Sequence, residues 1–256
     1  MPAPVTAALV AASCTVALAV AGTALVRSLS KRRTLAAAAL NETLPVNSAW
    51  WRARAKADGA LLYVALGDSA AQGIGASEPG RGYVGILAER IAHRSGLSVR
   101  TSNLSVSGAT VAQAVDYQLP RLAKQRPDIV TVSIGANDIA SWDAVAFEST
   151  LAAVLDALPP HAIVAELPYF YLPGNERRVA AANEIIHRLC RERGLTVAPL
   201  HATTKRPGIL GALTLFAGDR FHPNDRGYEL WASAFAPLVD RRVDQVLSAR
   251  ADAANQ

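Results

Sequence analysis

Five short apolar runs recur between residues 61 and 200, and each is bounded by polar or turn-forming positions. They span 61–66, 98–104, 129–134, 162–167 and 195–200. Four of them are nearly continuous in apolar residues, whereas 98–104 is the most polar. Strands that are covered on both faces have this uninterrupted apolar character. The pattern therefore predicts five buried β-strands.

Segments with helical spacing separate and follow these runs, at 83–94, 110–125, 142–158, 176–193 and 225–249. Pro223 and Asn224 form a helix-start signal before the last of them. Strands that alternate with helices indicate a parallel sheet with helices on both faces, joined by right-handed crossovers. We expect an α/β fold, specifically a flavodoxin-like three-layer α/β/α sandwich around a five-stranded parallel sheet.

Residues 2–26 contain no charged side chain, and about 20 helical residues suffice to cross a bilayer. Three interpretations remain open, and we favour an N-terminal transmembrane or signal-anchor helix over residues 1–27. A cleaved signal peptide is the second, because 17–19 and 19–21 read A-x-A, but no basic residue precedes the apolar run. A soluble, alanine-rich helix is the third.

The net charge of +5 is concentrated next to this segment. Residues 27–58 hold seven basic and two acidic side chains, which leaves 19 of each sign in residues 59–256. We interpret 28–58 as a basic juxtamembrane connector, with a helix over 35–40 that ends before Pro45 and Asn47, and 59–250 as the functional domain. The positive-inside rule favours a cytoplasmic domain on a single-pass membrane protein, with an exported domain as the alternative.

The composition also argues against several classes of partner. No stripe of basic and aromatic side chains indicates nucleic-acid binding. Cys14 and Cys190 lie in the apolar segment and in a predicted helix, which indicates neither a disulfide framework nor a zinc site. Gly73 and Gly75 form a G-x-G pair but lack the rest of a phosphate-binding fingerprint. We expect no metal and no organic cofactor.

Candidate chemistry begins with Ser69, which directly follows the first predicted strand in Leu66-Gly67-Asp68-Ser69. Asp219 and His222 stand three residues apart, about one helical turn. Serine, histidine and aspartate are the components of a nucleophilic hydrolase, in which the aspartate orients the histidine and the histidine takes the serine proton. Ala71 occupies the position of the second glycine in G-x-S-x-G, which argues against an α/β-hydrolase nucleophile elbow.

Two further motifs follow the second and third predicted strands, and they contain Gly108 and Asn137. Both can donate a hydrogen bond to an oxyanion, together with the backbone N–H of Ser69. Ligands bind beyond the carboxyl ends of parallel strands, so we expect these motifs to meet at one edge of the sheet. We interpret Asp68 and Asp138 as residues that fix these loops without taking part in the chemistry.

The order of these motifs, with Ser69, Gly108, Asn137 and His222 in turn, resembles the SGNH (GDSL-type) hydrolase family over about residues 60–240. Ala70 stands where the family usually has leucine, a position that carries no chemistry. The resemblance implies a flavodoxin-like order of strands and a serine esterase that acts on carboxylic esters through an acyl-enzyme. It also implies that the enzyme needs no cofactor.

The substrate stays open at the level of sequence. Apolar loops over 169–173 and 209–216 fit an acyl pocket, for a short or medium chain or for a lipid at a membrane, and equally fit packing on the core. An acyltransferase or a carbohydrate deacetylase would use the same catalytic groups. A membrane-anchored binding module without activity is a further alternative from a different class. Sequence does not decide the oligomeric state.

Overall fold

The computed structural model describes residues 28, 30–32 and 34–255. Its centre is one sheet of five strands, all paired in parallel, in the order β2-β1-β3-β4-β5. The strands are β1 (Leu61–Gly67), β2 (Val99–Asn103), β3 (Ile129–Ser133), β4 (Ile163–Ala165) and β5 (Thr196–Ala198). All five lie within the predicted apolar runs except for the last residue of β1. The α/β class and the five-stranded parallel sheet are confirmed.

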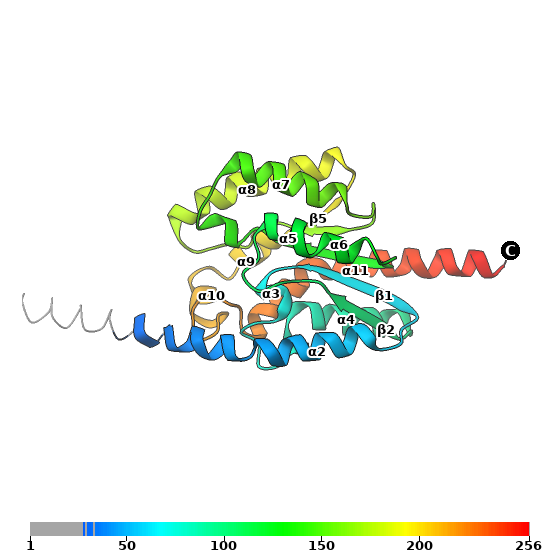
Figure 1. The fold of residues 1–256 in the computed structure, drawn as a ribbon, viewed down its shortest axis with the longest axis horizontal. Coiled ribbons are helices and arrows are strands. Elements are labelled where there is room, and N and C mark those ends of the chain that lie inside the picture. The colour runs from blue at the N-terminus through cyan, green and yellow to red at the C-terminus, as the bar shows by residue number, and fades with distance from the viewer. Residues whose placement is uncertain (1–27, 29, 33, 256) are drawn as a thin grey trace, which may run out of the picture.

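Alternate residues of each central strand enter different apolar layers, which explains the continuous apolar runs. Leu62, Val64 and Leu66 of β1 pack on one side, whereas Tyr63 and Ala65 pack on the other. The first layer is covered by α5 (Val111–Tyr117), α7 (Ala144–Asp156) and α8 (Pro173–Glu192). The second layer is covered by α2 (Leu44–Lys56), α4 (Tyr83–Ser95) and α11 (Asp225–Ala254). The three layers are visible in Figure 1.

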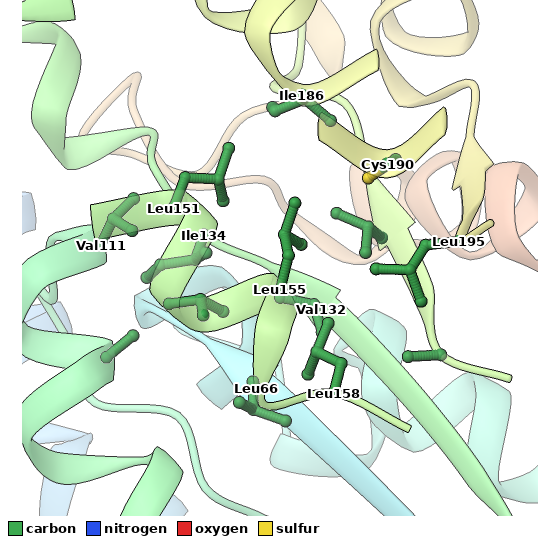
Figure 2. Packing of buried hydrophobic residues seen from close by; sticks show 14 of the residues in the cluster. Leu66, Val111, Val132, Ile134, Leu151, Leu155, Leu158, Ile186, Cys190 and Leu195 are labelled. Atoms are coloured by element: carbon green, nitrogen blue, oxygen red, sulfur yellow. The ribbon is translucent and has the colours of Figure 1, made fainter. Parts of the chain in front are cut away.

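The first layer is purely apolar at its centre (Figure 2). Leu155 of α7 and Cys190 of α8 lie in the same cluster as Leu66 and Val132 of the sheet, and all are buried. Burial raises the pKa of the Cys190 thiol to about 11, so this side chain is a neutral packing residue. The close packing of α7 and α8 on the sheet holds the carboxyl ends of β1 and β3 in place.

The helices begin and end near the predicted positions where the local capping signals are strong. Asp143 accepts hydrogen bonds from two backbone N–H groups at the start of α7, and Asn224 does the same from one at the start of α11. The predicted helix over 110–125 is instead divided into α5 and α6 (Leu119–Leu122) next to Pro120. Five short helices of the described chain were not predicted separately: α3 (Ser69–Gln72), η1 (Pro79–Arg81), η2 (Asn137–Ile139), α9 (Leu200–Lys205) and α10 (Gly208–Thr214).

Helix α2 lies in the segment that the sequence indicated as a connector, and it packs on the domain. The predicted helix over 35–40 ends before Pro45, at residue 42, whereas Asn47 does not break the chain of helices. Pro45 occupies the first turn of α2, where a proline loses no intrahelical hydrogen bond. The buried side chains of Asn47 and Trp51 both donate to the backbone oxygen of Gln72, at 2.9 and 3.0 Å. The end of α3 is therefore held from the N-terminal side.

No helix within residues 28, 30–32 and 34–255 combines the length and the apolar character needed to cross a membrane. The span that the sequence predicts over residues 1–27 lies outside the residues that the structure describes.

Candidate active site

Ser69 lies at the first position of α3, directly after the carboxyl end of β1. Asp68 caps this short helix, because its Oδ1 accepts the backbone N–H of Ala70 at 2.9 Å. The Ser69 side chain is nearly enclosed, with 5% of the residue exposed. The sharp strand-to-helix turn thus presents one hydroxyl at the sheet edge predicted for ligands.

Asp219 and His222 lie in the loop between α10 and α11, and His222 contacts Ser69 across 153 residues of the chain. Asp219 Oδ2 is 2.6 Å from His222 Nδ1, and His222 Nε2 is 2.9 Å from Ser69 Oγ. The partners assign the tautomer: the Nδ1–H donates to the carboxylate, and Nε2 accepts from the serine hydroxyl. The three predicted side chains form one continuous chain of hydrogen bonds.

The spacing of Asp219 and His222 has a different structural basis from the helical turn that was predicted. Their loop is a tight hairpin, in which Phe216 pairs with Pro223 as an antiparallel bridge. Arg220 at its tip has a left-handed φ of 57°, a conformation that costs a non-glycine residue about 1 kcal/mol. Asp219 Oδ1 supports the turn by accepting the backbone N–H groups of Phe221 and His222, at 3.0 and 3.1 Å.

The electrostatics of Asp219 suit a carboxylate that holds a neighbouring imidazole. Burial acts to raise its pKa, but the hydrogen bonds from the His222 side chain and from the backbone N–H of Phe221 outweigh it, so the pKa lies below its ordinary value. Asp219 is therefore ionised at neutral pH.

Asp68 and Asp138 accept hydrogen bonds from the backbone of the loops that carry the site. Asp138 accepts the backbone N–H of Val111 at the start of α5, at 3.1 Å, and burial raises its pKa above the usual range. Burial raises the pKa of Asp68 to about 6, although the Ala70 N–H and the charge of His222 act against this. Its second oxygen accepts the side-chain amide of Asn137 at 3.3 Å, which links the first and third motifs.

The three candidate oxyanion donors differ in what they contact. Asn137 Nδ2 donates to Ala109 O at 3.0 Å as well as to Asp68, so both of its hydrogens are engaged. Neither the backbone N–H of Ser69 nor that of Gly108 has a hydrogen-bond acceptor among the described residues. Gly108 has a φ of 77° and lies on an exposed turn after β2, with open space where a side chain would be.

A cavity of about 350 Å³ opens beside Ser69 and His222. Asp68 and Asn137 also line it, whereas Gly108 and Asp219 do not. Most of the other lining residues are apolar or aromatic: Tyr169, Phe170, Tyr171, Leu172, Leu215, Phe216, Phe221, Leu230 and Trp231. Both predicted loops therefore reach the cavity, the second through its C-terminal residues, and α11 adds a wall that was not predicted.

Gly75 is a residue whose importance for the site the sequence did not indicate. It has a φ of 99°, and a Cβ there would lie 2.5 Å from Pro223 O and 2.9 Å from the Cβ of His222. The same loop is held by Tyr228, whose hydroxyl donates to Ile74 O at 2.6 Å, and by Asp225, which accepts from Ser77. The loop after Ser69 and the loop of His222 are thus in direct backbone contact.

No group of three or more histidine, cysteine, aspartate or glutamate side chains in the described part of the chain could hold a metal ion. Two histidines outside the site pair with glutamates. His187 pairs with Glu166 at 2.8 Å, and His201 pairs with Glu176 at 3.0 Å.

Comparisons with known proteins agree with this architecture. Residues 65–230 match the GDSL-like lipase/acylhydrolase family. TesA is similar in structure, with 22% identity, a TM-score of 0.59, and coverage of 71% of this chain and 99% of that one. Axe2, an acetylxylan esterase from Geobacillus stearothermophilus, is similar with 21% identity, a TM-score of 0.58, and coverage of 70% and 94%.

LAE5, an alpha/beta hydrolase enzyme from the metagenome of Lake Arreo in Spain, has 22% identity, a TM-score of 0.59, and coverage of 72% and 96%. A comparison with curated protein sequences gives no significant match. At these identities, the structural likeness concerns the fold alone. The family match covers more than half of the chain, so the fold and site define a hydrolase, and the chain belongs to the GDSL-like lipase/acylhydrolase family. The predicted family is confirmed, and ester hydrolysis is its general chemistry.

Proposed function

We propose that this protein is a serine esterase that hydrolyses carboxylic esters through an acyl-enzyme on Ser69. The observation that carries the proposal is the chain of hydrogen bonds from Asp219 through His222 to Ser69, at 2.6 and 2.9 Å. Ser69 and His222 both line the cavity, so a bound ester would meet the hydroxyl and the base together. A hydroxyl becomes a competent nucleophile when an adjacent base takes its proton.

In the first half of the reaction, Ser69 Oγ attacks the ester carbonyl while its proton passes to His222 Nε2. The tetrahedral intermediate then expels the alcohol, which leaves with the proton from His222. In the second half, water attacks the acyl-enzyme with His222 as base, and collapse of the second intermediate releases the carboxylic acid and restores Ser69. Asp219 keeps the imidazole oriented and stabilises its positive charge.

The proposed oxyanion donors are the backbone N–H groups of Ser69 and Gly108 and the side-chain amide of Asn137. The two backbone donors are supported by their lack of any other acceptor among the described residues. Asn137 would exchange one of its present bonds, and the longer one, to Asp68 at 3.3 Å, is the weaker.

The aromatic and aliphatic lining of the cavity favours an ester with an apolar acyl chain over a small acetyl group on a sugar. A carbohydrate deacetylase and an acyltransferase remain the alternatives, the latter because an alcohol in place of water would also resolve the acyl-enzyme. The intact Asp219–His222–Ser69 contacts argue against a binding module without activity.

The test is a panel of p-nitrophenyl esters of increasing chain length, with acetylated xylan and thioesters beside it. Ser69→Ala should lower kcat by up to about 10⁶-fold and abolish labelling by a fluorophosphonate probe. Ser233→Ala, at an exposed serine of α11, is the matched control and should leave both unchanged. A Ser69→Ala variant that retains a tenth of the wild-type activity would refute the proposal.

A further inference from the structure

The mouth of the cavity carries an unusual concentration of exposed apolar side chains. Ten large apolar residues in the described part of the chain are substantially exposed, and five of them belong to the segments that line the cavity. We refer to these five as the apolar rim: Leu172, Ile209, Leu210, Leu213 and Phe221. Their exposed fractions lie between 50% and 82%. Exposed apolar side chains gathered on the segments around one cavity are typical of an interaction site.

Helix α10 contributes three of the rim residues and has two distinct faces. Ile209 and Leu213 are four residues apart and thus share one face, which is turned outward with exposures of 82% and 62%. Ala212 and Leu215 line the cavity from the same segment. The helix therefore separates the cavity from the surroundings, and its outer face has no partner in the described residues.

The surroundings of the rim are cationic. Lys205, Arg206 and Arg220 lie in residues 200–224, and the single acidic residue there is Asp219, which is buried against His222. A positively charged apolar surface is complementary to anionic lipid headgroups above an acyl layer. It is not complementary to itself, which argues against a second copy of the chain as the occupant.

The N-terminal helix of the described chain lies on the same side of the domain as the His222 loop. Residues 34–42 are helical and pass beside the His222 loop, since a Cβ on Gly218 would lie 3.1 Å from the Cβ of Ala36. This helix lies next to α10 in Figure 1 and exposes 60% of Leu35. In the sequence, the uncharged residues 2–26 come first, the basic residues 27 and 31–33 come next, and this helix follows them. The chain thus enters the domain at the rim.

We propose that the apolar rim rests on a bilayer containing anionic lipids, so that the cavity opens onto the membrane and takes an amphiphilic ester directly from it. This inference rests on the proposed esterase function for its substrate, but the docking itself does not depend on activity. It differs from simple tethering, because a tethered domain need not present any particular face to the lipid.

The first experiment locates the rim relative to the lipid. Full-length protein with Cys14→Ser receives one new cysteine, by Ile209→Cys or by Val145→Cys, and this cysteine is labelled with an environment-sensitive fluorophore. Each labelled protein is mixed with vesicles of phosphatidylcholine and phosphatidylglycerol. Val145 is the matched control, because it is 81% exposed on α7, in the opposite helical layer. The fluorophore at residue 209 should shift to the blue and be quenched by lipids brominated on the acyl chain, whereas that at residue 145 should do neither. Equal behaviour of the two positions would overturn the proposal.

The second experiment asks whether docking delivers the substrate. Ile209→Glu with Leu213→Glu should reduce hydrolysis of an ester dissolved in the vesicles by at least about tenfold, since even one buried aliphatic side chain contributes about that factor to partitioning. The same pair should leave hydrolysis of a water-soluble ester unchanged, and Val145→Glu should change neither.

The outcomes separate the two proposals. If the wild type hydrolyses no ester, the proposed function fails, and the fluorescence experiment still decides whether the rim docks. A blue shift at residue 209 that appears without lipid and grows with protein concentration would identify a second copy as the occupant. That result would overturn the membrane proposal.

Discussion

Replacing Asp219 with asparagine separates the electrostatic role of this side chain from its structural role. Oδ1 accepts two backbone N–H groups of the hairpin, at 3.0 and 3.1 Å, and an amide oxygen can keep both bonds. Oδ2, which lies 2.6 Å from His222 Nδ1, becomes an NH₂ group that can only donate. His222 must then accept at Nδ1 and carry its proton on Nε2. In that tautomer it cannot accept the proton of Ser69.

The expected result of Asp219→Asn is a fall in kcat of about 10⁴-fold, close to 5 kcal/mol in activation free energy, with the fold retained. Steady-state hydrolysis of a p-nitrophenyl ester measures kcat, and thermal unfolding shows whether the fold is retained. Asp225→Asn is the control, because Asp225 is a nearby aspartate that contacts Ser77 and not the histidine. A loss of less than about tenfold at an unchanged unfolding temperature would refute the role of Asp219 as the residue that sets the tautomer.

Three further changes test the surroundings of the site. Asn137→Ala should lower kcat by about 10²–10³-fold with little effect on KM, whereas a change in KM alone would make it a substrate-binding residue. Gly75→Ala should lower kcat and the unfolding temperature together, because its Cβ would lie 2.9 Å from that of His222; full activity would show that the two loops are not rigidly coupled. The pKa of Asp68 is raised from 3.8 to about 6, so the folded state binds its proton more tightly, and stability should fall as the pH rises from about 4 to 6. Relative to Asp68→Asn, the wild type should lose up to about 3 kcal/mol across that window in denaturant unfolding, and parallel pH profiles would contradict the shift.

The three central strands were predictable because β1, β3 and β4 are buried along their whole length. Leu62 and Tyr63 face opposite layers, so no polar residue interrupts the run that encodes β1. The convergence of Ser69, Asn137 and His222 was predictable for a related reason, since residues that follow parallel strands or precede the next helix collect at one edge. Pro120 signals that the predicted helix over 110–125 is divided in two. The sequence prediction gave more weight to the apolar periodicity and therefore kept one helix.

Other features have no local signal in the sequence. Arg220 adopts a left-handed conformation that is unusual for arginine, and only the surrounding hairpin requires it. Helix α2 buries only Asn47 and Trp51, so its attachment depends on the two side-chain bonds to Gln72 and on the packing of Trp51 in the second layer, and not on a continuous apolar face. A contact between two loops, such as that of Gly75 with His222, is a property of tertiary packing, and residue types alone do not reveal it.

The hydrogen bonds of Asn137 show how the proposed oxyanion site could favour the transition state over the substrate. Before the reaction, its amide donates to Asp68 and to Ala109 O, so a donor is not left unpaired in the free enzyme. Above about pH 6, Asp68 is ionised, and a neutral ester carbonyl is a poorer acceptor than this carboxylate. An oxyanion carries a full negative charge and competes with the carboxylate on equal terms. The hydrogen bond from the Asn137 side chain to Ala109 O is retained. The exchange thus becomes favourable only as charge develops, which is why the loss of Asn137 should appear in kcat and leave KM nearly unchanged.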